Sequence, residues 1–260
     1  MKTFEIPQIY RSTIISGIKE KRRVKDKLKK DFSPTVLDFE NVKILLARHF
    51  GFCYGVENAV EIAYSVLNEN QGKRIFLLSE MIHNPDVNAD LLSRGVKFLM
   101  DTKGNKLYDF DDLKPSDIVI VPAFGTTIEL QNELSALGID SYKYDTTCPF
   151  VEKVWNRAQQ IGERGFSVIV HGKPNHEETR ATFSRSQENS PTIVIKDMSE
   201  AVILAAYIRK EKSTEEFYRE FAGRFSEGFN PEKDLERFGV VNQTTMLAIE
   251  TQDIANFLKD

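Results

Sequence analysis

The sequence predicts an α/β fold in which small parallel sheets, each flanked by helices, repeat around a central site. Short runs rich in Val and Ile alternate with amphipathic helical patterns, and polar motifs follow the ends of these runs. Buried parallel strands are typically short, apolar and joined by helices. A chain of 260 residues is long enough for one large domain or for two to three small ones.

Residues 1–40 form a basic N-terminal extension, although the whole chain has a net charge of −4. The basic run from Lys19 to Asp31 has interleaved acids and no aromatic residues, so we expect a solvated helix rather than a nucleic-acid-binding arm. No apolar run reaches membrane-spanning length, and the N-terminus lacks a signal peptide's apolar core. Two cysteines in this length indicate a reducing compartment, so we expect an intracellular protein with no membrane or nucleic-acid partner.

The first cysteine lies in residues 41–54. The apolar run from Val42 to Ala47 predicts a buried strand, Cys53 follows between two glycines, and a helical pattern begins after it. A thiol at the N-terminal end of a helix meets the positive end of the helix dipole, which favours a reactive or metal-binding thiolate. Taken alone, this stretch favours a simpler interpretation of Cys53 as a small buried hydrophobe.

The second cysteine repeats this arrangement. Residues 141–144 predict a short strand, Cys148 follows, and Pro149 stands where proline is tolerated, at a first helical position. Two unrelated core cysteines would rarely share such a junction. Their separation excludes a C-x-x-C zinc or thioredoxin motif, which leaves a disulfide or two thiolates at a shared site. The low cysteine content disfavours the disulfide.

The remaining chain predicts two α/β units, at residues 55–147 and 148–260. The strand-like runs are RIFLLS, DIVIVPA, SVIVHG, TIVIKD and GVVNQ, and the helical patterns include GVENAVEIAYSVLNE, NADLLSRG, IELQNELSALG and SEAVILAAYIRKE. The polar segment at about 210–239 interrupts the alternation. Its regularly spaced aromatic residues predict a helical insertion that packs on the second unit.

Four polar motifs come just after predicted strands: His83 with Asn84, AFGTT (123–127), NHEET (175–179) and NQTT (242–245). Open α/β sheets build their sites at the carboxyl ends of their strands, so these motifs predict one active centre. Histidines and helix N-termini suit a phosphate or diphosphate, and a carboxylate beside a thiolate-bound metal suits proton transfer. Each motif also has an ordinary structural interpretation, as turn residues, first-turn acids or helix caps.

In order along the chain, GFCYGVENAV, IHNPDVN, PAFGTT, DTTCPFVEKVWN, HGKPNHEETRAT and NQTTM resemble the motifs of the 4-hydroxy-3-methylbut-2-enyl diphosphate reductases, the LytB/IspH family. The resemblance runs from about residue 41 to the end of the chain. DTTCPFVEKVWN and HGKPNHEETRAT are long and specific. The basic extension, the PAFG form and the aromatic insertion resemble the longer cyanobacterial and plastid branch of the family.

This resemblance implies an enzyme of the non-mevalonate isoprenoid pathway. It would remove the allylic hydroxyl of its diphosphate substrate with two electrons and two protons, giving isopentenyl and dimethylallyl diphosphate. The family has three similar α/β units around a [4Fe–4S] cluster held by three cysteines, and receives electrons from ferredoxin or flavodoxin. The resemblance also implies a cytoplasmic protein, or a plastid stromal one in a photosynthetic eukaryote, and is compatible with a homodimer.

The resemblance assigns roles to individual residues. Cys53 and Cys148 match cluster ligands, and His83 and His176 match histidines that hold the diphosphate. Glu178 matches the catalytic glutamate of the proton relay, and Thr244 matches the threonine beside the substrate hydroxyl.

The sequence departs from the family pattern in two ways. Phe124 stands where the shorter bacterial branch has another diphosphate-binding histidine. The third cysteine and the Ser and Asn residues that grip the diphosphate lie beyond the NQTT motif in the family, whereas this chain ends at Asp260. We therefore expect a truncated reductase whose third unit is largely missing, with residues 41–54 belonging to that unit. The alternative is a non-catalytic diphosphate-binding or structural module without a cluster.

Overall fold

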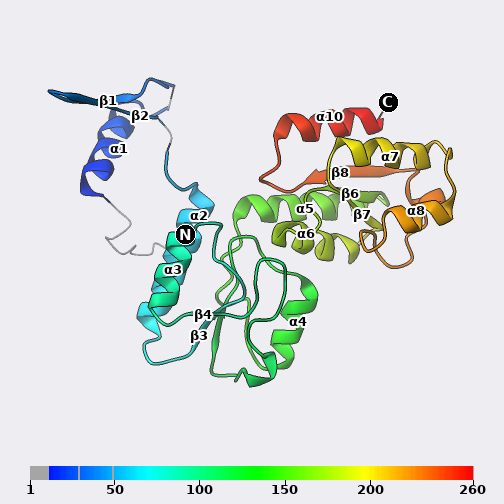
Figure 1. Ribbon diagram of the computed structural model, residues 1–260, viewed down its shortest axis with the longest axis horizontal. Helices are drawn as coiled ribbons and strands as arrows, with labels where there is room; N and C mark the ends of the chain where they lie inside the picture. Colours follow the sequence, from blue (N-terminus) through cyan, green and yellow to red (C-terminus); the bar gives the residue numbers. More distant parts are fainter. Residues whose placement is uncertain (1–11, 29, 49, 260) are drawn as a thin grey trace.

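A computed structural model describes residues 12–28, 30–48 and 50–259. Figure 1 shows the arrangement of the elements. The helices are α1 (Thr13–Lys25), α2 (Tyr54–Glu69), α3 (Pro85–Ser93), α4 (Ile128–Ala136), α5 (Pro149–Glu163), α6 (Glu177–Gln187), α7 (Met198–Ile208), α8 (Thr214–Glu220), α9 (Pro231–Asp234) and α10 (Ala248–Lys259), with a 3-10 turn η2 (Phe110–Asp112). The strands are β1 (Thr35–Phe39), β2 (Val42–Leu46), β3 (Ile75–Leu77), β4 (Lys97–Phe98), β5 (Ile118–Ile120), β6 (Ser167–His171), β7 (Thr192–Ile195) and β8 (Phe238–Asn242). In this part of the chain, no helix is both long and apolar enough to cross a membrane.

Two parallel sheets confirm the predicted α/β class. The first sheet has the order β4-β3-β5 and the second the order β7-β6-β8, and every pairing within them is parallel. Helices accompany both sheets, and the two sheets lie in separate parts of the molecule (Figure 1). Strand β4 has only two residues, which is too short for a periodic signal, and it was not predicted.

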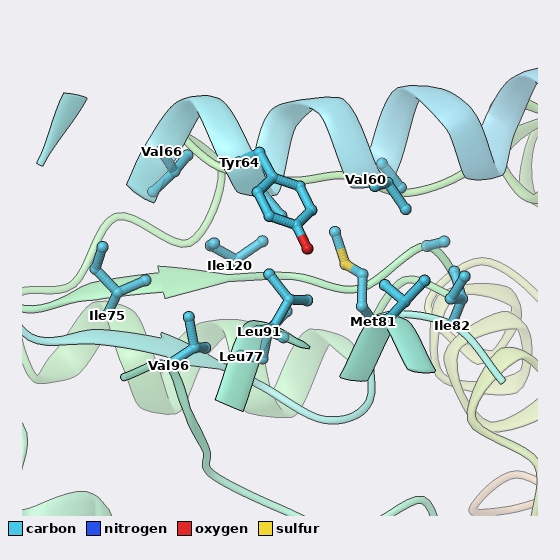
Figure 2. Close-up of a cluster of buried hydrophobic side chains, with 14 of the residues drawn as sticks. Val60, Tyr64, Val66, Ile75, Leu77, Met81, Ile82, Leu91, Val96 and Ile120 are labelled. Carbon is cyan, nitrogen blue, oxygen red and sulfur yellow. The ribbon is translucent and has the colours of Figure 1, made fainter. Parts of the chain in front are cut away.

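Successive residues of β3 enter two different cores. Ile75 and Leu77 pack with residues of α2 and α3, as Figure 2 shows, whereas Phe76 and Leu78 pack with residues of η2 and α4. This alternation follows from the two-residue period of a strand, and burial on both faces explains why the run is apolar throughout. Each fully buried large side chain contributes roughly 1.5–3 kcal/mol to folding.

The second sheet is built in the same way. Ile169 of β6 packs in a core with α7, α8 and α10, whereas Val168 and Val170 pack with residues of α5. The predicted insertion contains α8 and α9, and its buried aromatic residues Phe217 and Phe221 belong to the α7 core. The expected packing of this insertion on the body of the protein is therefore confirmed.

The prediction of a buried strand at 42–47 is correct for the strand and wrong for its burial. Strand β2 pairs antiparallel with β1, a strand that was not predicted, and Ile44 and Leu45 are 44% and 64% exposed. The hairpin and α1 lie apart from both parallel sheets in Figure 1. Helix α1 itself has no buried residue, as expected for a solvated helix.

The prediction of a strand at 141–144 is wrong. These residues form a turn, and only Asp145 makes an isolated parallel bridge, to Val121. The carboxylate of Asp140 accepts hydrogen bonds from the backbone N–H groups of Tyr142 and Lys143 over 3.1 and 3.2 Å. A short acidic side chain that bonds its own backbone in this way competes with strand pairing. Cys148 is therefore preceded by a turn and a bridge rather than by a strand.

Candidate active site

The four predicted polar motifs lie at the carboxyl ends of four parallel strands. The motifs with His83 and with Phe124 follow β3 and β5, which are neighbours in the first sheet. The motifs with His176 and with Thr244 follow β6 and β8, which are neighbours in the second sheet. The prediction that these groups lie at strand ends is confirmed. The candidate site is formed by loops from two different sheets rather than from one.

His83 and His176 meet across the two sheets. Their Nε2 atoms lie 3.1 Å apart, within hydrogen-bonding distance. The buried side chain of Asn88 fixes the loop that carries His83. The Asn88 amide accepts a hydrogen bond from the Met81 N–H and donates one to the Ile82 carbonyl. His176 is the N-cap of α6, and its Nδ1 accepts from the Glu178 N–H over 3.2 Å.

Phe124 forms one wall of this histidine pair. Its ring stacks on His83 with a centroid separation of 4.3 Å and meets His176 edge-on at 5.4 Å. Burial lowers the pKa of His176 to about 4, and the nearby charges of His83, Lys173 and Arg180 add to this effect. His176 is therefore a neutral imidazole at physiological pH.

Glu178 is buried beside Thr244. It is 1% exposed, and its two carboxylate oxygens accept from the backbone N–H and, over 2.9 Å, from the hydroxyl of Thr244. Burial raises the pKa of Glu178, while the hydrogen bonds from Thr244 act in the opposite direction. A raised pKa favours the protonated carboxyl group, which is the form that a general acid needs. Thr244 bonds Glu178 rather than capping α10, which begins at Ala248.

The neighbouring Glu177 points toward the first sheet. It is 6% exposed, and its Oε2 has no hydrogen-bond partner. Burial raises its pKa to about 7, and a hydrogen bond with Ser79 reduces that effect. Arg180, on the same helix, donates to the backbone carbonyls of Thr102 and Lys103 in the first unit. Helix α6 thus carries candidate site residues at its N-terminus and is also bonded to the loop that follows β4.

The two cysteines are each the N-cap of a helix, Cys53 for α2 and Cys148 for α5. In both cases the thiol makes no capping hydrogen bond, so the sulfur remains available. Gly55, in the first turn of α2, lies directly against Cys148, and a Cβ atom at that position would overlap the Cys148 sulfur. The structure therefore brings the two helix N-termini together, as the shared junction suggested, and leaves both cysteines unpaired.

Gln243 is a site residue that the sequence analysis missed. Its Oε1 accepts from the Thr179 hydroxyl and the Lys173 N–H, and its Nε2 donates to Thr245. Gln243 therefore ties the loop after β6 to the segment after β8. The sequence offered one signal, since this buried glutamine sits inside the NQTT motif, but its amide could not be distinguished from an ordinary loop residue.

The residues present fit a thiolate-bound metal group in part. Two cysteine sulfurs, a common type of metal ligand, lie at adjoining helix N-termini. Residues 12–28, 30–48 and 50–259 contain no cluster of three or more His, Cys, Asp or Glu side chains that could hold a metal ion. A cluster bound through three cysteines would need a ligand in addition to Cys53 and Cys148.

The family model for the LytB protein matches residues 44–260, which include every motif of the site. The chain belongs to the LytB family. The curated relatives of this LytB chain include cyanobacterial proteins named 4-hydroxy-3-methylbut-2-enyl diphosphate reductase. The protein from Synechococcus sp. (strain RCC307) is 40% identical over 254 residues, covering 98% of this chain and 58% of the relative. That from Prochlorococcus marinus (strain NATL1A) is 37% identical, covering 98% of this chain and 59% of its own length. The predicted resemblance to the family and to its cyanobacterial members is confirmed.

Solved structures give the same result for the fold. A structure of (E)-4-hydroxy-3-methyl-but-2-enyl diphosphate reductase is 25% identical, with a TM-score of 0.56, and the match covers 80% of this chain and 60% of the other. The Plasmodium falciparum reductase structure is 21% identical, with a TM-score of 0.59 and 54% of its chain covered, and supports the fold alone. This LytB chain thus spans less than two thirds of the length of these relatives.

Proposed function

We propose that this chain is the substrate-binding and proton-donating part of a 4-hydroxy-3-methylbut-2-enyl diphosphate reductase. The reaction adds two electrons and two protons to the substrate, breaks the allylic C–O bond and gives isopentenyl or dimethylallyl diphosphate plus water. The observation that carries the proposal is that a histidine pair and a buried carboxyl group lie after strands of two parallel sheets, in a chain that also brings two thiols to adjoining helix N-termini.

The histidine pair is the proposed diphosphate site. His83 and His176 face each other through Nε2, and Lys173 and Arg180 add positive charge on the side of His176. Imidazole and cationic groups are suitable partners for phosphate oxygens, because charge-assisted hydrogen bonds are stronger than neutral ones. Phe124 stacks on His83 and orients its ring.

Glu178 is the proposed proton donor. Its burial favours the protonated carboxyl group, and Thr244 holds its orientation. Of the two protons in the reaction, one leaves with the hydroxyl as water and one ends on carbon. Thr244 would lie beside the substrate hydroxyl, so that the proton that completes the leaving water comes from Glu178.

A [4Fe–4S] cluster is the proposed source of the electrons when it is bound. Cys53 and Cys148 would be two of its ligands, because both sulfurs are unpaired and lie at adjoining helix N-termini. We also propose ferredoxin or flavodoxin as electron donor and a location in the cytoplasm or plastid stroma, as for the family. The division into units at 55–147 and 148–260, with residues 41–54 belonging to a third unit, likewise remains a proposal.

Turnover can be tested in a chimaeric protein in which this chain is joined to the part of the Synechococcus relative that it does not match. After anaerobic reconstitution with iron and sulfide, we expect the chimaera to reduce the substrate with a chemical reductant. The Synechococcus relative itself is the positive control. A chimaera that holds a cluster at the same stoichiometry as the relative but shows no turnover would contradict the proposal.

The second candidate, a diphosphate-binding module without redox activity, makes a different prediction. It predicts calorimetric binding of isopentenyl diphosphate to the 260-residue chain, but no turnover in the cluster-loaded chimaera. The two candidates therefore differ in one measurement. The names of the curated relatives favour the reductase.

A further inference from the structure

The side chain of Trp155, on helix α5, lies against the loop that carries Phe124. Gly125, the next residue of that loop, has a φ of +75°, and a Cβ atom there would lie 2.5 Å from two carbon atoms of the Trp155 ring. The glycine therefore allows both the left-handed backbone and the close approach of the indole. The Gly125 N–H donates to the Pro122 carbonyl over 2.9 Å, which closes a tight turn around Phe124.

The same indole is bonded to helix α6. Its Nε1–H donates to the hydroxyl of Thr182 over 3.1 Å, and Thr182 is fully buried. The guanidinium group of Arg185, also on α6, lies over the Trp155 ring at 4.0 Å from its centroid. Helix α6 begins directly after His176, its N-cap. The indole thus lies between the loop of Phe124 and the helix that begins at the histidine pair.

The geometry of the histidine pair depends on the relative position of this loop and this helix. Phe124 stacks on His83 with a centroid separation of 4.3 Å and meets His176 edge-on at 5.4 Å. We propose that Trp155 is a positioning residue of the diphosphate site. Its indole sets the separation between Phe124 and His176 and, through Phe124, the orientation of His83. This inference rests on the proposed function, because it assigns the diphosphate to the histidine pair.

A second attachment of the loop to α6 lies further from Phe124. The backbone N–H of Ile128 donates to the hydroxyl of Ser184 over 2.9 Å and so ties the start of α4 to α6. Three residues separate Phe124 from this bond, whereas Trp155 makes its contact at the residue next to Phe124. A buried indole N–H needs a partner, so the bond to Thr182 also restricts the orientations that the Trp155 ring can adopt.

The position of Phe124 over His83 can be observed by NMR without a ligand. An aromatic ring shields protons that lie over its face, so the imidazole protons of His83 should have lower chemical shifts in the wild type than in Phe124→Leu. The chain has four histidines, so His83→Gln is enough to assign these signals. We expect Trp155→Leu to move them toward the values of Phe124→Leu. Trp155→Phe, which keeps an aromatic ring against Gly125, should move them less.

Calorimetry of isopentenyl diphosphate binding to the same variants measures the effect on the site. Trp155→Leu should weaken binding about threefold to tenfold, because a displaced His83 makes a poorer hydrogen bond to the phosphate. Trp155→Phe should restore part of the affinity. Thr182→Val keeps the volume but removes the acceptor of the indole N–H, so it should shift the His83 signals and the affinity in the same direction by a smaller amount. This variant decides the question if Trp155→Leu does not fold.

Ile161→Val is the matched control for a general loss of stability. Ile161 lies on the same helix as Trp155, but it packs with Val168 and Val170 of β6. Loss of its methyl group should lower the stability and leave the His83 signals and the affinity unchanged. Wild-type signals and affinity in Trp155→Leu and Thr182→Val, or equal changes in Ile161→Val, would contradict the inference and leave the proposed function standing. A wild-type chain that binds no diphosphate would contradict both.

Discussion

The candidate site has an exposed half and a buried half. The side chain of His83 is 46% exposed, and its partner His176 is half-buried, whereas Glu178 is 1% exposed and is bonded through both carboxylate oxygens. Charged groups in contact with water interact weakly and exchange partners easily, which suits reversible capture of an anion. A buried carboxyl group is held in one environment that sets its protonation, which suits proton transfer. The difference predicts that the two halves can be separated by mutation.

Glu178→Gln should have the largest effect. The amide keeps the size and an acceptor but cannot release a proton, and loss of a positioned acid typically costs about 10²–10⁴ in rate. We expect this loss in the turnover of the chimaera, with affinity for isopentenyl diphosphate nearly unchanged because the histidine pair is intact. Turnover at a near wild-type rate would remove Glu178 from the proton relay.

His83→Ala should act on binding rather than on the chemical step. A hydrogen bond to a charged group contributes roughly 1.5–3 kcal/mol, so we expect affinity for the diphosphate to fall by about 10- to 150-fold. The turnover number at saturating substrate should change far less than in Glu178→Gln. Equal losses in affinity and turnover number for both variants would erase the distinction between the two halves.

Glu177→Gln tests a buried carboxyl group that lacks the partners of Glu178. Because the folded-state pKa of Glu177 is about 7 and the pKa of the unfolded carboxyl is near its ordinary value of 4.5, the folded state holds a proton that the unfolded state releases. Its contribution to stability therefore falls as pH rises from about 4.5 to 7. The neutral amide should stabilise the protein by on the order of 2 kcal/mol at alkaline pH and have little effect below pH 4.5.

Denaturant unfolding of both proteins across this pH range gives the comparison. His176 has the opposite dependence, since a pKa lowered to about 4 means that stability is lost as pH falls from 6.5 toward 4. That contribution is common to both proteins and cancels in their difference. Glu188→Gln, on the exposed end of the same helix, is the control and should show no such pH dependence. A Glu177→Gln effect that is equal at all pH values would indicate repacking rather than removal of a buried charge.

Thr244→Val should have the smallest effect. It removes the hydroxyl donor to Glu178 but keeps the backbone N–H bond, so about 1 kcal/mol of stabilisation of the carboxylate is lost. We expect turnover of the chimaera to fall roughly fivefold and its pH profile to shift upward, because the bond that lowers the pKa of Glu178 is absent. Thr245→Val, at a residue that bonds Gln243 instead, should leave the profile in place.

Local patterns in the sequence were enough for the parallel sheets and for the gathering of polar groups at strand ends. The apolar strands at 118–120 and 167–171 and the helix caps at both cysteines depend on nearby residues, so periodicity and spacing predict them. The pairing of His83 with His176 depends on how two sheets pack, which no local pattern encodes. Sequence reasoning therefore named residues that the structure brings together without predicting which of them touch.

The errors have physical causes of the same kind. Strand β2 was expected to be buried because its side chains are apolar. Burial also requires another layer that packs on the strand, and the pairing of β2 with β1 in a two-stranded hairpin leaves Ile44 and Leu45 exposed. The run at 141–144 has strand-forming residues, but the carboxylate of Asp140 bonds the backbone and imposes a turn. Gln243 escaped notice because an amide in a loop gives no periodic signal.

The two halves of the site also differ in whether their residues follow strands of one sheet or of two. Glu178 and Thr244 follow strands of one sheet and move with it, whereas the His83–His176 contact joins two sheets. A small hinge motion between the sheets would separate the imidazoles and leave the carboxyl group and its hydroxyl partner in register. In the proposed reaction, release of the product would then need only the two imidazoles to separate, while Glu178 keeps its hydrogen bond to Thr244.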